Sequence, residues 1–149
     1  MKKLFIYYSL TGNGDNVAKL FESKGYEVRK VIEDRKLPKA FFFKMMVGGF
    51  LAATNKVGKL IDYNNDVSEY DEIVIGSPIW NKRFPPATNA ILKETNFENR
   101  KLTFVIYSGS GEGPKALKKV NELYKEANVI FLQEPKKHED ELKKLDPLF

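Results

Sequence analysis

The 149-residue sequence contains no cysteine and a single histidine, His138. The absence of cysteine excludes disulfides, thiolate nucleophiles, iron–sulfur clusters and cysteine-ligated zinc. His138 lies in a highly charged C-terminal stretch, where a Ser-His-Asp triad or a multi-histidine metal site would have to be built around it. We therefore expect neither a metal site nor a hydrolytic triad.

Long apolar runs are also missing, since no run approaches the roughly 18 residues that a membrane span needs. The run Leu4–Tyr8 is short and is followed by polar, glycine-rich sequence rather than a cleavage site, so it predicts a buried strand and not a signal peptide. Without cysteine or an export signal, we expect a cytoplasmic location.

The formal net charge of +5 suggests an acidic partner or surface. The basic residues are spread along the chain and form no cluster interleaved with aromatic residues. We therefore expect no nucleic-acid binding.

Apolar runs alternate with helical patterns along the chain, which predicts a single α/β domain over residues 1–149 with a parallel sheet and crossover helices. The run Tyr26–Ile32 alternates apolar and charged residues and predicts an edge strand, whereas Glu72–Gly76 is apolar on both faces and predicts a central one. The expected strands are Leu4–Tyr8, Tyr26–Ile32, Glu72–Gly76, Leu102–Tyr107 and Asn128–Leu132. The expected helices are Asp15–Lys24, Pro85–Glu94, Lys115–Ala127 and Lys137–Leu145.

The segment Phe41–Ala53 is almost entirely apolar but too short to span a bilayer. One interpretation is a helix packed on the sheet. The other is a partly exposed docking patch for a partner or a membrane surface, because four lysines flank or interrupt it: Lys39, Lys44, Lys56 and Lys59.

A polar, glycine-containing loop, Ser9–Asn16, connects the first strand to the first helix. A helix N-terminus offers free backbone N–H groups and a positive dipole end, and glycines let the backbone approach a ligand closely. The loop contains no lysine or arginine, so the N–H dipoles would meet a phosphate's charge. The alternative is an ordinary strand–helix turn capped by Asp15 or Asn13. Val17 stands where a dinucleotide fingerprint needs glycine or alanine.

Two further loops follow the third and fourth predicted strands. Residues 76–86 contain the only tryptophan, Trp80, whose indole either stacks on a flat heteroaromatic ligand or caps the core. In residues 107–114, small residues occur at alternate positions, which would leave the backbone exposed to the edge of a ligand ring. All three loops fall at the carboxyl edge of one sheet, where open α/β sheets bind ligands.

These motifs resemble those of the flavodoxins, specifically the short-chain kind, over nearly the whole chain. Residues 8–14 (Tyr-Ser-Leu-Thr-Gly-Asn-Gly) resemble the flavodoxin phosphate loop, residues 70–80 resemble the next strand with its flavin-flanking loop, and Ser108–Gly113 matches the last flavin loop in place. The resemblance implies a three-layer sandwich with a five-stranded parallel sheet of order 2-1-3-4-5. It also implies FMN as cofactor, held by Ser9, Leu10, Thr11, Gly12, Asn13, Gly14, Ser77, Pro78, Ile79, Trp80, Asn81, Ser108, Gly109, Ser110, Gly111 and Glu112.

The sequence departs from the family pattern at three points. Gly14 stands where many members carry threonine, which removes a hydroxyl from the phosphate site. Ser110 and Glu112 stand where many members carry an aromatic ring, so one flavin face would be open. The chain is basic, whereas electron-carrying flavodoxins are usually acidic. Lys82 and Arg83, if they lie near the ring, would stabilise the anionic reduced flavin.

The flavin would carry out the redox chemistry, so we expect no catalytic side chain. The favoured hypothesis is an electron carrier between larger redox partner proteins. The alternatives are an FMN-dependent reductase of a small molecule such as a quinone, or the flavin-carrying partner of a larger reductase, and a flavodoxin fold that has lost FMN and serves in protein interaction. The absence of a dinucleotide motif favours the carrier.

Overall fold

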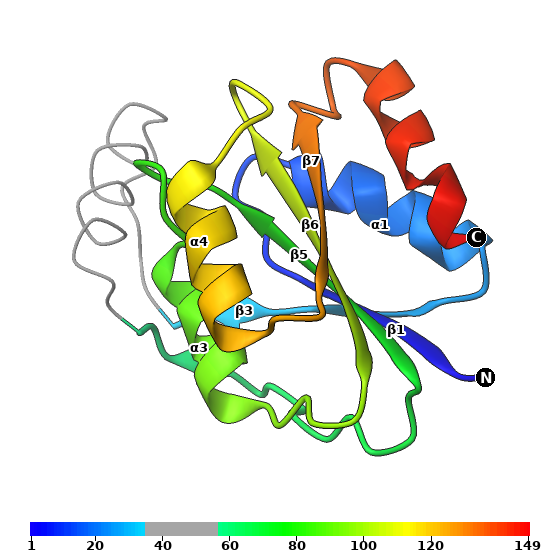
Figure 1. The fold of residues 1–149 in the computed structure, drawn as a ribbon, viewed down its shortest axis with the longest axis vertical. Helices are drawn as coiled ribbons and strands as arrows, with labels where there is room; N and C mark the ends of the chain where they lie inside the picture. Colours follow the sequence, from blue (N-terminus) through cyan, green and yellow to red (C-terminus); the bar gives the residue numbers. More distant parts are fainter. Residues whose placement is uncertain (35–56) are drawn as a thin grey trace.

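The computed structural model describes residues 1–34 and 57–149 (Figure 1). Five parallel strands form the sheet in the order β2-β1-β5-β6-β7, which is 2-1-3-4-5 when these strands alone are counted along the chain. A separate antiparallel pair joins β3 (Ile32–Glu33) to β4 (Leu60–Ile61). The strands of the main sheet are β1 (Lys3–Tyr7), β2 (Glu27–Lys30), β5 (Glu72–Pro78), β6 (Lys101–Ser108) and β7 (Asn128–Gln133).

Helices cover both faces of the sheet, as Figure 1 shows. Helix α1 (Asn13–Ser23) and the 3₁₀-helix η1 (Glu139–Leu148) lie on one face, and α3 (Pro86–Glu94) and α4 (Pro114–Leu123) lie on the other. Side chains alternate across a strand, so the two faces of β1 enter two different cores. Leu4 and Ile6 join the core that contains residues of α3 and α4, and the neighbouring aromatic residues join the core that contains residues of α1 and η1.

The predicted fold class and strand order are confirmed. The prediction of a central strand at residues 72–76 holds, because Ile73, Val74 and Ile75 are all fully buried between β1 and β6. The predicted edge strand is β2, which pairs only with β1 among the described strands. Pro86 occupies the first turn of α3, where a missing N–H costs nothing.

Most element bounds differ from those predicted by one or two residues, and the differences at three elements bear on the packing. The edge strand is shorter, with Ile32 in the separate β3–β4 pair. Helix α4 ends at Leu123 because Tyr124 adopts an extended conformation, with φ −139° and ψ 81°. The C-terminal helix spans Glu139–Leu148 as a 3₁₀-helix. A 3₁₀-helix has three residues per turn, and the leucines at 142, 145 and 148 therefore share the face that packs on the core.

The apolar segment Phe41–Ala53 lies outside the described residues, and neither interpretation of it is tested. Among the described residues, the structure contains no helix that is long and apolar enough to cross a membrane.

Candidate functional site

The loops after β1, β5 and β6 meet at the carboxyl edge of the sheet. Tyr8, which follows β1, packs edge-on against Trp80 in the loop after β5, with ring centroids 5.7 Å apart and an interplanar angle of 70°. The backbone carbonyl of Tyr8 accepts a hydrogen bond from the hydroxyl of Tyr107 on β6. The structure thus brings together the three predicted loops.

Gly12 begins helix α1 as its N-cap, in the left-handed conformation with φ 95°. The hydroxyl oxygen of Ser9 accepts hydrogen bonds from the amides of Gly12 (3.2 Å) and Gly14 (3.0 Å). In the described part of the chain, the amides of Asn13 and Asp15 have no acceptor, as expected in the first turn of a helix. The expected alternative, a cap from the Asn13 or Asp15 side chain, is wrong, because Ser9 accepts from the first-turn amide and the side chains of Asn13 and Asp15 bond elsewhere.

Asp15 has its own partners away from the cap. Its carboxylate accepts hydrogen bonds from the Tyr7 hydroxyl (2.7 Å) and from the Lys30 ammonium (2.8 Å). Partial burial raises the pKa of Asp15, but the hydrogen bonds from Lys30 and Tyr7 outweigh it, and the net pKa lies below its ordinary value. Because Lys30 pairs with the Asp15 carboxylate, this carboxylate repels an anion at the start of α1 less strongly.

Gly14 is a glycine for a packing reason. A Cβ atom at this position would lie 2.4 Å from the Tyr107 hydroxyl oxygen, and 2.8 Å from both Ser9 Cβ and Tyr7 Cδ2. Tyr107 is 2% exposed, and burial raises the pKa of its hydroxyl. The space that a threonine side chain would fill in the phosphate loop is therefore filled by Tyr107.

The loop after β5 folds into a tight turn. The backbones of Trp80 and Arg83 exchange two hydrogen bonds (2.9 and 3.1 Å), while Asn81 (φ 49°) and Lys82 (φ 66°) between them are both left-handed, as in a type I′ turn. Asn81 and Lys82 are exposed at its tip. Trp80 is 5% exposed and belongs to the core under α3 and α4, so stacking of its indole on a ligand stays a prediction.

Ser77, predicted to contact the ligand, is fully buried. Its hydroxyl is hydrogen-bonded to that of Thr88 on α3, at 2.6 Å, and to the carbonyl of Pro78, at 2.9 Å. The hydroxyl therefore anchors the loop to α3, which leaves backbone groups and neighbouring side chains to face a ligand.

The loop after β6 is held by serine hydroxyls. Ser108 Oγ donates to the carbonyl of Glu112 at 3.0 Å, and the amide of Glu112 donates to Ser110 Oγ at 3.3 Å. Gly109, Ser110 and Glu112 are exposed. No aromatic residue occurs between positions 108 and 113, so this loop offers backbone and small polar groups and no covering ring.

A fourth loop, residues 134–138 after β7, reaches the same edge and was missed by the sequence analysis. The Lys136 amide donates to Asn13 Oδ1 (3.1 Å), and Asn16 Nδ2 donates to the Pro135 carbonyl (3.1 Å). The ammonium of Lys136 lies 3.4 Å from the Thr11 carbonyl oxygen. The expectation that N–H dipoles meet a phosphate's charge stays a prediction, and tertiary structure places a cation beside this loop. The available signal was the position of Lys136, just beyond the carboxyl end of a strand of the same sheet.

This cation borders a hollow beside the start of α1. The hollow has a volume of about 350 Å³, within the range of small-molecule sites, and is lined by Thr11, Asn13, Glu134, Lys136 and Lys137. A ligand there would contact both the predicted phosphate loop and the loop after β7.

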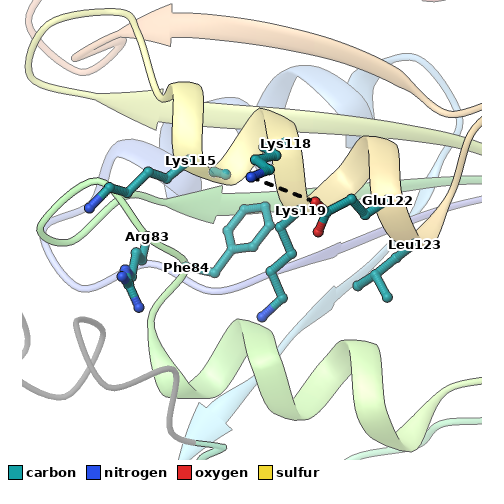
Figure 2. Close-up of a pocket in the computed structure, with 8 residues that line it drawn as sticks. Arg83, Phe84, Lys115, Lys118, Lys119, Glu122 and Leu123 are labelled. Atoms are coloured by element: carbon teal, nitrogen blue, oxygen red, sulfur yellow. Dashed lines mark ion pairs between the residues drawn. The ribbon is translucent and has the colours of Figure 1, made fainter.

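A second hollow, of about 540 Å³, lies between α4 and the loop after β5 (Figure 2). Its described lining includes four cationic side chains, those of Arg83, Lys115, Lys118 and Lys119, and one carboxylate, that of Glu122, which pairs with Lys118 at 3.9 Å. Partial burial and the nearby Arg83 charge lower the pKa of Lys119. The hollow is a concave basic surface beside the loop that contains Trp80.

No family model matches the sequence, and no curated protein matches it. A "putative flavoprotein" from Bacteroides uniformis is 25% identical, with a TM-score of 0.73 over 86% of this chain and 85% of that one. A "putative flavoprotein" from Bacteroides eggerthii is 16% identical, with a TM-score of 0.75 over 98% and 96% of the two chains. A flavoprotein from Lactobacillus acidophilus in complex with FMN is 20% identical, with a TM-score of 0.71 over 93% and 97%.

Sheet order and these likenesses define the class of the chain as the flavodoxin-like α/β fold. Within this class the chain resembles flavoproteins along most of its length, as the sequence motifs predict.

Proposed function

We propose that this protein binds FMN non-covalently at the carboxyl edge of the sheet and uses it to transfer electrons. The observation that carries the proposal is the convergence of the three predicted loops on the edge where α1 presents unpaired first-turn amides. The Lactobacillus acidophilus flavoprotein, which shares the fold, binds FMN and supports this choice of ligand.

The residues at this edge fit the phosphate of FMN. Asn13 in the first turn of α1 and Lys136 border one hollow, and the amides of Asn13 and of the nearby Asp15 have no acceptor among the described residues. Amide and cationic donors are the groups that hold a phosphate. Residues 9–14 would therefore hold the phosphate. The loops Ser77–Asn81 and Ser108–Glu112 would flank the ring.

FMN, when bound, supplies the redox chemistry, because it accepts and gives up electrons. The chain's own residues bind and orient it. Gly109, Ser110 and Glu112 are exposed, so backbone groups of this loop would be available to the ring edge, and the lack of an aromatic side chain would leave one ring face accessible. Positive charges at Lys82 and Arg83 would favour added negative charge on a ring nearby.

We favour a carrier role between larger redox proteins over turnover of a small molecule, because the chain contains no dinucleotide fingerprint. We also propose a cytoplasmic location, which the cysteine-free sequence leads us to expect. The accessible ring face supports the second candidate, an FMN-dependent reductase of a small molecule such as a quinone. Steady turnover of NAD(P)H with a quinone by the purified FMN-loaded protein would favour this second candidate.

The basic hollow of Figure 2 supports an acidic redox partner. Arg83 lies two residues after the predicted ring-flanking segment, so a carboxylate-rich surface held by Arg83 and the lysines of α4 would approach the flavin edge. The half-exposed Leu123 adds an apolar contact at the end of the hollow. Complementary charge of this kind raises association rates more than affinity.

Titration of the purified protein with FMN tests the central proposal. Binding should quench flavin fluorescence at micromolar concentration and leave a shifted flavin absorption spectrum after desalting. Unchanged FMN fluorescence and a colourless protein after desalting would refute FMN binding and leave only the fold.

Two small oxidants test the role of the basic hollow. Reduced, FMN-loaded protein would be reoxidised with ferricyanide, an anion, or hexaammineruthenium(III), a cation, in a stopped-flow instrument. Reversal of Lys115 and Lys118 to glutamate should slow the first reaction and speed the second. Lys19→Glu/Lys143→Glu makes the same change in net charge on α1 and η1, on the other face of the sheet, and should have a smaller effect. Equal effects of both pairs would show that net charge alone acts.

A further inference from the structure

We propose that Lys136 is the counter-ion of the FMN phosphate and makes the site selective for phosphorylated flavin over riboflavin. The inference rests on the proposed FMN function. It adds a binding residue from outside the three loops that the sequence motifs define.

The side chain of Lys136 lies over the predicted phosphate loop, where it contacts two adjacent residues, Thr11 and Gly12. Its side chain lies against Gly12, where a Cβ atom would be 3.3 Å from Lys136 Nζ and 3.5 Å from Lys136 Cδ. The ammonium is 3.4 Å from the Thr11 carbonyl oxygen. A phosphate that accepts a hydrogen bond from the first-turn amide of Asn13 would therefore lie within reach of this ammonium, since Asn13 and Lys136 border the same hollow.

The charges around the hollow leave Lys136 as the cation available to a ligand. Glu134 and Lys137 form an ion pair with each other at 3.1 Å, so their charges largely cancel. Asp15 is paired with Lys30. Within residues 1–34 and 57–149, Lys136 has no carboxylate partner and contacts only a neutral carbonyl oxygen through its ammonium. Exchange of this carbonyl for a phosphate would turn a neutral hydrogen bond into a charge-assisted one.

The ammonium is not needed to hold the loop in place. The loop after β7 is attached to α1 by the backbone amide of Lys136, which donates to Asn13, and by the bond from Asn16 to the carbonyl of Pro135. Both bonds survive any substitution of the Lys136 side chain. Removal of the charge should therefore change ligand binding and leave the fold intact.

Affinities of FMN and riboflavin for the wild-type protein and three variants test the inference. Lys136→Met removes the charge and keeps an unbranched apolar side chain, Lys136→Arg keeps the charge, and Lys137→Met is the matched control beside it. Dissociation constants come from flavin fluorescence quenching at low ionic strength, and urea unfolding verifies that each variant folds.

Lys136→Met should weaken FMN binding about tenfold, the size of one charge-assisted hydrogen bond. Riboflavin affinity should change less than about twofold because riboflavin has no phosphate to pair with the ammonium. Lys136→Arg should stay close to the wild-type protein, and Lys137→Met should have a smaller effect than Lys136→Met, since Lys137 is already paired with Glu134. The affinity of the wild-type protein for FMN should fall more steeply with added salt than that of Lys136→Met.

Two results would overturn the inference while leaving the proposed function intact. The first is an unchanged FMN affinity in Lys136→Met. The second is an equal loss for FMN and riboflavin, which would mean that the lysine shapes the site and does not pair with the phosphate. Failure of the wild-type protein to bind FMN at all would instead refute the proposed function and the inference together.

Discussion

Replacement of Gly14 by alanine should destabilise the protein, against the usual trend for a helix. In a helix this substitution normally stabilises by up to about 1 kcal/mol. Here the new Cβ would lie 2.4 Å from the hydroxyl oxygen of Tyr107, a buried group that donates to the carbonyl of Tyr8. Overpacking costs about 1–3 kcal/mol, and displacement of the hydrogen bond adds about 1 kcal/mol. We therefore expect a net loss of about 1–3 kcal/mol in the free energy of unfolding.

A double-mutant cycle, measured by urea unfolding, assigns the clash to the Tyr107 hydroxyl. Tyr107→Phe alone should cost about 1 kcal/mol, because it removes one buried donor. The combined Gly14→Ala/Tyr107→Phe variant should lose less than the sum of the single losses by about 1 kcal/mol or more. Gly109→Ala is the control, since a Cβ there meets nothing within 4 Å. Additive losses, or a Gly14→Ala variant as stable as the wild-type protein, would refute this explanation of the glycine.

Three further predictions concern charge and backbone strain. The lowered pKa of Asp15 stabilises the fold above the ordinary value of 3.8 and loses this contribution as the pH falls through the folded-state pKa. The difference in unfolding free energy between the wild-type protein and Asp15→Asn should therefore shrink as the pH falls, when both are unfolded with urea over a series of acidic pH values. A difference that stays constant down to about pH 2 would contradict this prediction. Lys82→Gly should raise the urea midpoint by releasing left-handed strain of about 1 kcal/mol, whereas Lys82→Val should lower it. Glu72, 3% exposed, accepts a 2.7 Å hydrogen bond from Tyr26, so Glu72→Gln should cost about 1–3 kcal/mol in the same assay. A loss below about 0.5 kcal/mol would show that the charge is not needed.

Local patterns were sufficient to locate the strands and helices of the main sheet domain to within a few residues, whereas the order of the strands came from the resemblance to the flavodoxins. The run Ile73-Val74-Ile75 can be buried on both faces only in a central strand, and a proline pair can open a helix but not continue one. The 3₁₀ geometry of η1 was missed because a leucine spacing of three is compatible with either helix type, and contact with the core selects between them.

At the candidate site, too, some features could be predicted from local sequence and others depend on tertiary contacts. Loops rich in glycine and small polar residues could be placed at one sheet edge because carboxyl ends of parallel strands share an edge. The sequence left open whether Trp80 caps the core, and the burial of Ser77 could not be predicted, since both depend on packing against α3 and on the turn at Asn81. In the sequence, Lys136 is one lysine in a charged stretch. Its neighbour in space is Gly12, more than a hundred residues away.

The α/β class, the strands and the three loops at one sheet edge could be predicted from the sequence because hydrophobic period and turn chemistry are local properties, and the strand order followed from the resemblance of the loop motifs to the flavodoxins. Tertiary structure alone decided which charges face the site and why position 14 is glycine. Both depend on contacts between residues distant in the chain, Lys136 with Gly12 and Tyr107 with Gly14, and such contacts exist only after the strands have paired.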